Sequence, residues 1–484
     1  MPRRDARIRS IRSIPLTGLV LIAACAVNPA TGRRQLSLIS ESREIEIGRE
    51  ADGDITSSLG LAGSPDLQDF VRGIGADLAA RSERPNLPWS FKLVDDPAVN
   101  AFALPGGFIF VTRGILASLN SEAELAGVLG HEIGHVTAKH SVSRMSRQQL
   151  QQIGLGVGMA VSSDVRRFGD VVTGGFQLLN LSYSRGDESQ SDELGIRYMT
   201  RAGYDLHALG GVFRTLALVA GGEGRVPQWR STHPDPENRE VRVEGIIAES
   251  GQDYSGFVVE GDSYLRRLQG LMYGSNPREG YFRGVVFKHP ELAFTLRFPA
   301  GWRGVNQKTQ VVGVSPREDA VLVLSIDSDA RGVERALDDF LSQTGMVVGR
   351  VSTSSIGGFP AARAPFRLQS ADSSLEGDVA FVDYGGAVYR LIGYGQRSTW
   401  DRHRGAVAEA IESFGELREP AALGVQPWRL EIVEVPSAMS FAAFMEAYPG
   451  PVEAEDVARL NRVTVDSHLE AGRLMKRVRG RRLR

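Results

Sequence analysis

The stretch that decides the fold runs from Ser121 to His140 and reads SEAELAGVLGHEIGHVTAKH. Ser121 and Glu124 form a capping-box pattern, in which two side chains satisfy free backbone N–H groups at the start of a helix. Apolar residues then recur at helical spacing up to the histidines. We therefore expect one helix, on which His131 and His135 lie one turn apart and project from the same face.

Two imidazoles on one helical face can bind a single zinc ion. Glu132 lies one step further round this helix, next to the metal but not on it. A carboxylate in that position can take a proton from the attacking water and later protonate the leaving amine. The pattern His-Glu-x-x-His is typical of zinc-dependent peptidases. The alternative is that both histidines are ordinary residues of an apolar core.

A zinc site of this kind needs a third protein ligand. The helix-like run after Tyr183-Ser184-Arg185 offers Glu188 and Asp192, which are four residues apart and share a face. Glu188 would complete a His-His-Glu set that holds one zinc ion per chain and leaves a fourth position open for water. Asp192 is placed to accept a hydrogen bond from a ligand histidine, and Gly195 would let the two helices approach closely. The alternative is a solvated acidic helix face.

Four segments carry a family resemblance: NAFALPGGFIFVTRG at 100–114, the histidine helix, Tyr-Ser-Arg-x-x-Glu from Tyr183, and Ser-Thr-His-Pro at 231–234. Together they resemble the gluzincin peptidases, the family that includes the CAAX prenyl proteases, HtpX and Oma-type enzymes, and within it the periplasmic BepA-like lipoproteins. NPATGRRQL at 28–36 looks like the mature start of that branch. The resemblance covers about residues 25 to 270. It departs where the family's Glu-x-Glu-Ala-Asp reads ESQSD, so the second glutamate and the alanine are lost.

The resemblance implies a zincin-type endopeptidase that acts on misfolded or stalled envelope proteins. It makes the strand Phe108, Ile109, Phe110 and Val111 an edge strand beside the zinc, which pairs with an extended substrate backbone. On the residues alone, this apolar and β-rich run fits an interior strand as well. The resemblance also makes His233 a lid residue with a catalytic role, either as a fourth zinc ligand at rest or as a donor to the tetrahedral intermediate.

The chain has eight histidines, three of which belong to the predicted site. The others lack a partner at a ligand spacing, which predicts solvated or structural roles for them. They are His140, His207, His289, His403 and His468.

Residues 1–24 are expected to be a lipoprotein signal peptide. Arginines precede an apolar stretch from Ile14 to Ala24 that is too short to cross a bilayer as a permanent helix. Its end resembles the lipoprotein cleavage box, so Cys25, the only cysteine, would become the lipidated first residue. The alternative is an ordinary secretory signal. Val27 stands at the second position after the cysteine in place of aspartate, and resemblance to sorting signals then favours the periplasmic side of the outer membrane.

The predicted fold class is α+β. A mainly helical zincin-type peptidase domain with a small sheet at 25–274 is followed by an α+β sandwich at 283–418 and a small segment at 426–480. The sandwich looks like the PsbP-like fold, and because it shows no catalytic cluster we expect a binding or spacer role. The last segment resembles a LysM glycan-binding module without its usual glycine-aspartate start. Peptidoglycan contact is one hypothesis for it, and a degenerate packing domain is the other.

Composition limits the function classes. The 484 residues carry a formal net charge of -2, which gives no long-range attraction to nucleic acid. The motif residues predict a zinc endopeptidase, and the resemblance implies that it is periplasmic, lipid-anchored and acts on unfolded envelope polypeptides. The two alternatives are a non-catalytic chaperone or assembly factor, and a zinc hydrolase that acts on cell-wall peptides.

Overall fold

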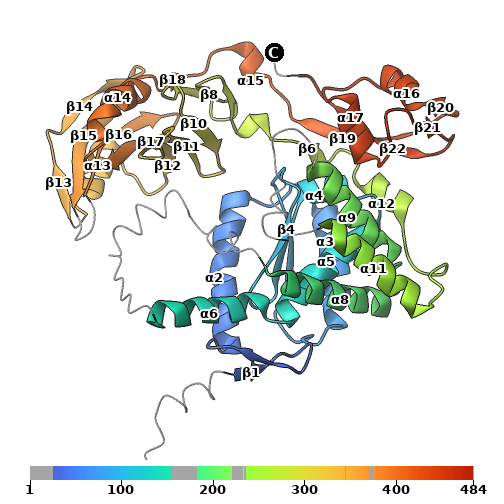
Figure 1. Ribbon diagram of the computed structural model, residues 1–484. Helices are drawn as coiled ribbons and strands as arrows, with labels where there is room; N and C mark the ends of the chain where they lie inside the picture. The colour runs from blue at the N-terminus through green and yellow to red at the C-terminus, as the bar shows by residue number, and fades with distance from the viewer. Residues whose placement is uncertain are drawn as a thin grey trace, which may run out of the picture.

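The computed structural model describes residues 25–154, 183–220, 233, 236–343, 345–369 and 374–482 (Figure 1). The expected signal peptide lies outside the described residues, whereas Cys25 begins the short strand β1 (Cys25–Val27), which pairs with β2 (Arg34–Leu36). Among the described helices none is long and apolar enough to cross a bilayer. The α+β class is confirmed.

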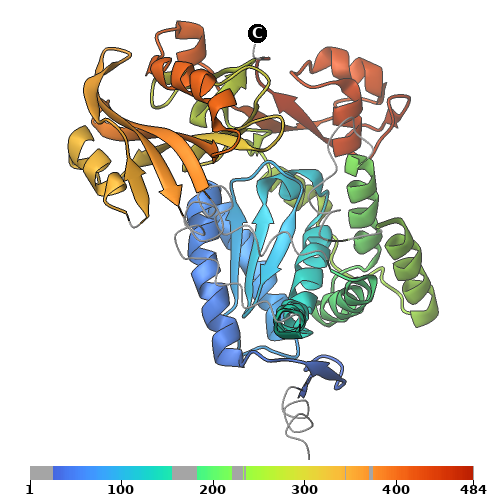
Figure 2. The same ribbon diagram turned by 60° about the vertical axis from the view of Figure 1, so that its left-hand side comes forward.

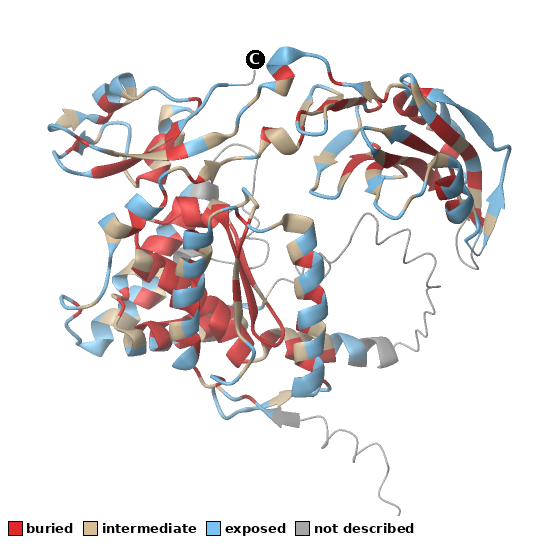
Figure 3. Cartoon of the chain, turned by 180° about the vertical axis from the view of Figure 1, so that it is seen from behind, coloured by how far each residue is buried: buried red, intermediate tan, exposed pale blue. Residues whose placement is uncertain are grey.

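Helices make up most of the chain up to residue 271, and α5 is the one that the others surround. Every residue of α5 from 123 to 137 is buried, and α3, α8 and α9 pack against it. Buried residues gather inside this helical part of the molecule (Figure 3). A helix that is buried all round lies inside a core, so its polar side chains must find protein partners there. The helices of this part are α2 (Glu41–Leu59), α3 (Pro65–Ala80), α4 (Arg113–Ser118), α5 (Glu122–Thr137), α6 (His140–Gly154), α8 (Arg185–Ala202), α9 (His207–Ala220), α11 (Pro236–Ser250) and α12 (Gly261–Arg267).

Helix α5 begins where the sequence predicted. The Ser121 hydroxyl accepts a hydrogen bond from the backbone N–H of Glu124 at 3.2 Å. The carboxylate of Glu124 accepts from the N–H of Asn120 rather than from that of Ser121, so only half of the capping box forms. The predicted close approach of two helices is also present, because a Cβ on Gly195 of α8 would lie 3.1 Å from the backbone nitrogen of His131.

Three strands form the small sheet beside α5, in the order β3-β5-β4 (Figure 2). They are β3 (Ser90–Val94), β4 (Ala101–Leu104) and β5 (Phe108–Thr112). Strand β5 pairs in parallel with β3 and antiparallel with β4, so both of its edges are occupied. Phe108 and Phe110 pack on one face with α2, while Ile109 and Val111 join the main core on the other.

The prediction that Phe108 to Val111 form the substrate-binding edge strand is therefore wrong. This run is fully buried because it is the central strand, and a central strand has no free backbone groups to offer a peptide. Within the described residues β4 has a single strand partner, so β4 is the edge on this side of the sheet.

Residues 277–416 form a sheet with cores on both faces. Eight strands pair mainly in the order β10-β11-β12-β17-β16-β15-β13, with β14 also on β15. Helix α13 covers one face, and α14 with the four-stranded sheet β18-β9-β8-β7 covers the other. The elements are η2 (Pro277–Glu279), β7 (Tyr281–Arg283), β8 (Val286–His289), β9 (Phe294–Arg297), β10 (Arg303–Asn306), β11 (Gln310–Val314), β12 (Ala320–Asp327), α13 (Val333–Leu341), β13 (Met346–Val348), β14 (Ser352–Ile356), β15 (Phe359–Gln369), β16 (Ser374–Tyr384), β17 (Ala387–Gln396), η3 (Trp400–Arg402), α14 (Arg404–Glu412) and β18 (Gly415–Glu416).

The last part of the chain packs against the first part. Strand β6 (Met272–Tyr273) pairs with β19, so the sandwich is inserted between two neighbouring strands of the sheet β22-β19-β6. Leu430, Leu474 and Val478 belong to the same core cluster as α5. The elements of this part are α15 (Pro420–Leu423), β19 (Trp428–Glu434), β20 (Met439–Ser440), α16 (Phe441–Ala447), α17 (Ala454–Leu460), β21 (His468–Leu469) and β22 (Leu474–Arg479).

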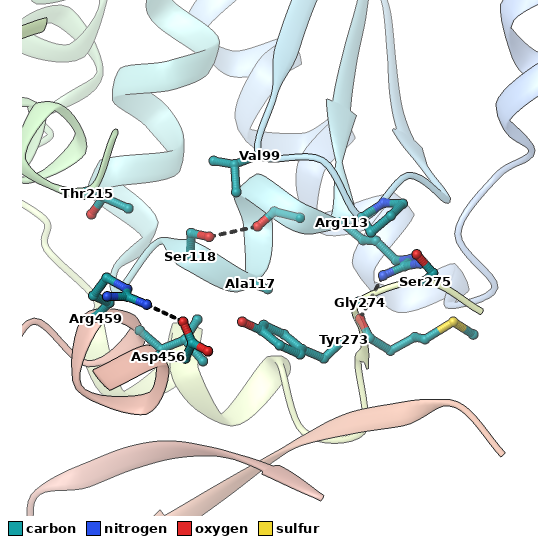
Figure 4. Close-up of a pocket in the computed structure, with 14 residues that line it drawn as sticks. Val99, Arg113, Ala117, Ser118, Thr215, Tyr273, Gly274, Ser275, Asp456 and Arg459 are labelled. Carbon is teal, nitrogen blue, oxygen red and sulfur yellow. Dashed lines mark hydrogen bonds and ion pairs between the residues drawn. The ribbon is translucent and has the colours of Figure 1, made fainter. Parts of the chain in front are cut away.

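Buried polar contacts hold this C-terminal part, residues 428–482, against the helical part. Lys476 donates hydrogen bonds to the carbonyls of Ala117 at 2.8 Å and Leu119 at 2.9 Å. Arg462 binds both carboxylate oxygens of Glu124 at 2.6 Å. A cavity of about 260 Å³ lies at the same seam, between α4, the β6 segment and α17, with Tyr273 in its wall (Figure 4).

Candidate metal centre

Two histidines of α5 face the centre of the site. His131 and His135 are 2% and 1% exposed, and their Nε2 atoms lie 3.0 Å apart. Their four-residue spacing brings both rings to one helical face, as the sequence predicted. Burial lowers the pKa of His135 well below its ordinary value, so its imidazole is a neutral base that can accept a metal ion.

Helix α8 supplies a carboxylate to the same point. The capping box of Ser184 and Asp187 fixes where α8 begins, and one residue later Glu188 faces the histidines. Its Oε2 lies 3.5 Å from Nε2 of His131, and its Oε1 lies 3.4 Å from Nε2 of His135. Burial alone would raise the pKa of Glu188, but His233 and the α5 histidines outweigh it and hold the pKa far below the ordinary value. The carboxylate is therefore ionised.

His233 is the fourth group at this point. It is 1% exposed, and its Nδ1 lies 2.9 Å from Oε1 of Glu188 and 3.3 Å from Nε2 of His131. Its other ring nitrogen, Nε2, lies 3.6 Å from Oε1 of Glu132.

The geometry of these four groups fits a tetrahedral zinc ion. Ligand distances of about 2.0–2.1 Å correspond to about 3.3 Å between neighbouring ligand atoms. The ligand atoms of His131, His135, Glu188 and His233 all lie within 4.8 Å of one another, and most of the separations above are close to that edge length. Two or three imidazoles with one carboxylate are a donor set that zinc prefers.

Glu132 lies beside this cluster without a hydrogen bond from any described residue, and Nε2 of His233 is an ionic neighbour at 3.6 Å. Both of its carboxylate oxygens are buried and lack a hydrogen-bond partner among the described residues. Burial raises the pKa of Glu132 above its ordinary value. A buried acceptor without a partner is costly in a folded protein, and a carboxylate with a raised pKa next to a metal site is suited to accept a proton from water.

Comparison with known proteins agrees with this geometry. Residues 65–247 match Peptidase family M48. These residues form an M48 peptidase domain. The "Beta-barrel assembly-enhancing protease" of Yersinia pestis is 28% identical over 227 residues, which cover 45% of this chain and 47% of that protein. The Escherichia coli protein of the same name is 27% identical over 241 residues, covering 47% and 50%.

Relatives also occur among mitochondrial proteins. "Mitochondrial metalloendopeptidase OMA1" of Schizosaccharomyces pombe is 28% identical over 232 residues, covering 46% of this chain and 66% of that protein. The chain spans about half the length of the bacterial relatives it matches. The predicted resemblance to this class of metallopeptidases is confirmed by the family match and by these relatives.

A likeness of another kind concerns about a quarter of the chain. The solution structure of cyanobacterial PsbP from Synechocystis covers 28% of this chain and 95% of its own at 16% identity, with a TM-score of 0.24. That TM-score is too low to assign a shared fold to the sandwich, so its PsbP-like character stays a prediction.

Asp192 of the M48 domain lies where the sequence predicted a second carboxylate. Its Oδ1 is 2.9 Å from Nδ1 of His131, so it accepts a hydrogen bond from the ring that faces the site. Arg239, at the start of α11, binds Asp192 through Nε at 2.9 Å and through Nη2 at 2.6 Å. Its Nη1 lies 2.7 Å from Oε2 of Glu188 but is not aligned for a hydrogen bond, so that contact is electrostatic.

The sequence reasoning did not find Arg239. Burial alone would raise the pKa of Asp192, and Arg239 outweighs it and lowers the pKa. The guanidinium also stacks over the ring of Phe213, 4.6 Å from its centroid. One sequence signal could have indicated Arg239, because it lies only six residues after His233, which was already predicted to reach the site.

His140 of the M48 domain is the other residue whose surroundings were not predicted. It is only 4% exposed, so of the two predicted roles, solvated or structural, the structural one remains. Its Nδ1 lies 3.0 Å from Nδ1 of His135, and its Nε2 lies 2.7 Å from the side-chain oxygen of Gln190. The ring of Tyr183 stacks on that of His135, with 3.7 Å between the ring centroids.

Proposed function

We propose that this chain is a zinc-dependent endopeptidase that hydrolyses peptide bonds in misfolded or stalled envelope proteins. The observation that carries the proposal is the convergence of His131, His135 and Glu188 on one point, with the buried carboxylate of Glu132 beside it, to which no described residue donates a hydrogen bond. The family match supports the metallopeptidase chemistry. The bacterial relatives are named for enhancing β-barrel assembly, which supports envelope proteins as the substrate class.

The chain's own residues divide the work as follows. His131, His135 and Glu188 would hold one zinc ion, and Asp192 and Arg239 orient this set. A bound zinc ion lowers the pKa of a water molecule to about 7 and polarises a carbonyl group. Glu132 takes a proton from the attacking water at its free carboxylate oxygen. It then delivers that proton to the amine that leaves.

His233 can serve the reaction in either of two ways. Its Nδ1 lies at ligand distance from the cluster, where it would fill the fourth position at rest. Away from the cluster, the same imidazole would instead donate a hydrogen bond to the tetrahedral intermediate. The contacts of Nδ1 favour the resting-ligand role, and four protein ligands describe a closed site.

An extended substrate needs a free strand edge, and β4 is the candidate. Its residues Ala101–Leu104 precede the central strand and contact α5. Backbone pairing along β4 would select extended chains with little demand on side-chain identity. Such a preference suits a peptidase that acts on unfolded segments.

The decisive test is the change Glu132→Gln in the full chain. The amide keeps the size of the side chain but cannot take the proton, so casein cleavage should fall by at least about a hundredfold. Metal analysis should show the same zinc content as wild type, because Glu132 is not a ligand. Retained cleavage at full zinc content would refute the general-base role, and absence of zinc from both proteins would refute the site.

Two alternative functions predict different results for wild type and for the same variant. A non-catalytic chaperone would bind unfolded clients equally well with and without Glu132, and wild type would show no cleavage. A cell-wall peptide hydrolase would cleave muropeptides and leave casein intact. Client capture by the Glu132→Gln variant together with casein cleavage by wild type would show that holding and cleavage coexist.

We also propose a lipid anchor at Cys25, on the periplasmic side of the outer membrane. The signal-like first 24 residues support this proposal. Fractionation of cells carrying Cys25→Ser should move the protein from membranes to the soluble periplasm. Peptidoglycan contact by residues 426–480 is a separate hypothesis, and failure of the full chain to sediment with purified sacculi would end it.

A further inference from the structure

The two ligand histidines of α5 have different partners behind them. Nδ1 of His131 donates a hydrogen bond to the carboxylate of Asp192, at 2.9 Å. His135 instead faces a second imidazole, because Nδ1 of His140 lies 3.0 Å from its own Nδ1. Two ring nitrogens in hydrogen-bond contact require one to donate and the other to accept.

The direction of this hydrogen bond follows from the role of His135. A neutral imidazole that gives Nε2 to a metal carries its proton on Nδ1. His135 must then donate, and Nδ1 of His140 must accept. The Ser191 hydroxyl, 3.3 Å from the same nitrogen, can also donate to it.

The remaining proton of His140 has a matching acceptor. With Nδ1 as acceptor, neutral His140 carries its proton on Nε2, which lies 2.7 Å from Oε1 of Gln190. The carboxamide oxygen accepts without bringing a charge, and the nearby carboxylate of Asp187 lies beyond hydrogen-bond distance, with its Oδ1 3.7 Å from the same nitrogen. Each donor in the series from His135 through His140 to Gln190 therefore meets an acceptor.

We propose that His140 and Gln190 form an uncharged relay that fixes the ring orientation and the tautomer of His135 for metal binding. They are positioning residues, since neither reaches the reacting atoms. His135 thus has neutral hydrogen-bond partners behind it, whereas His131 has the carboxylate of Asp192.

This inference rests on the zinc site proposed above, and zinc affinity is its readout. We would measure it by chelator competition in the full chain carrying Glu132→Gln, so that a failure of proteolysis does not affect the result. His140→Phe removes the acceptor and should weaken zinc binding about 10- to 100-fold, the usual effect of losing such a partner. Gln190→Leu should weaken it less. His207→Phe, at an exposed histidine, is the matched control and should bind zinc as wild type does.

Gln190→Glu tests the charge argument. A carboxylate at this position makes His140 a better acceptor and His135 a more basic ligand, so zinc should bind as tightly as in wild type or more tightly. The absorption bands of the cobalt-substituted protein should shift in this variant, which a merely structural role would not cause. Zinc binding by His140→Phe equal to wild type, or weaker binding by Gln190→Glu than by Gln190→Leu, would overturn the relay.

A folding defect can be separated from a positioning defect. Circular dichroism of the metal-free proteins should show the same helix content in wild type and variants. If His140→Phe does not fold, His140→Asn keeps an acceptor oxygen and should retain most of the zinc affinity. A His140→Asn protein that folds but binds zinc no better than Gln190→Leu would also overturn the relay.

Discussion

At the scale of single residues, the state of the site depends on His233. Its Nδ1 lies 2.9 Å from Glu188 and 3.3 Å from His131, which are ligand-to-ligand distances. Replacing it by alanine should open the fourth coordination position to water. We expect His233→Ala to cleave casein several-fold faster than wild type at equal zinc content, and to release zinc more readily to a chelator.

The control for this experiment is His207→Ala, because His207 is an exposed histidine that pairs with Asp205. It should leave both rates unchanged. Slower cleavage by His233→Ala with unchanged zinc release would contradict the resting-ligand role and identify His233 as a donor to the intermediate.

The sequence revealed the residues that follow a helical spacing and missed those that do not. His131 with His135, and Glu188 with Asp192, are pairs at i and i+4, so each pair shares a face whatever the tertiary fold. Arg239 and His140 reach the site through contacts between separate helices. No local pattern encodes such contacts, and His233 was found only through the family resemblance.

At the scale of elements, the site depends on how closely α5 and α8 approach. Gly195 has no room for a side chain, because a Cβ there would lie 3.1 Å from the nitrogen of His131 and 3.2 Å from the carbonyl carbon of Gly130. Gly195→Val should push the helices apart and move Glu188 away from the histidines. We expect a loss of stability of about 1–3 kcal/mol and zinc binding weakened at least tenfold.

Urea unfolding and chelator competition would measure these two effects. Gly186→Val is the matched control on the same helix, since its Cβ would meet only the Ser184 hydroxyl, at 3.7 Å. Tight zinc binding by Gly195→Val would show that the helices can separate without losing the site.

Strand order is where the sequence could not decide. The run Phe108 to Thr112 has the same apolar, β-rich letters whether it lies at an edge or in the centre. Its place is set by two pairings, with β3 before it and β4 next to it in the chain. The helix boundaries were easier to predict, because Ser121 and Ser184 cap α5 and α8 through local hydrogen bonds.

At the scale of the whole molecule, the chain builds one core from its two ends. The predicted change from helical to strand-rich near Gly274 is present, but β6 pairs with β19 across the inserted sandwich. A two-residue strand such as β6 carries no sequence signal of its own. The C-terminal part therefore contacts α4 through Lys476 and the start of α5 through Arg462.

Lys476 makes the stability of this contact sensitive to pH. Its side chain is 0% exposed, and burial lowers its pKa from 10.5 to about 7. In the unfolded chain the same amine keeps a pKa of about 10.4. Below pH 7 both states are protonated and the folded state carries the full cost of the buried ammonium. Between pH 7 and 10 the unfolded state binds more protons, so the stability due to this group rises with pH.

The expected gain from pH 7 to pH 9 is about 2 kcal/mol. Lys476→Met removes the titrating amine, so the difference in unfolding free energy between wild type and variant should shift by that amount in favour of wild type. Urea titrations of both proteins at the two pH values measure the shift. Arg477→Met removes the next side chain of β22, which binds Glu431, and its difference from wild type should not change with pH. A difference for Lys476→Met that is equally flat would mean that the carbonyls of Ala117 and Leu119 and the nearby Glu124 compensate the buried charge, so that the amine stays protonated in the folded state.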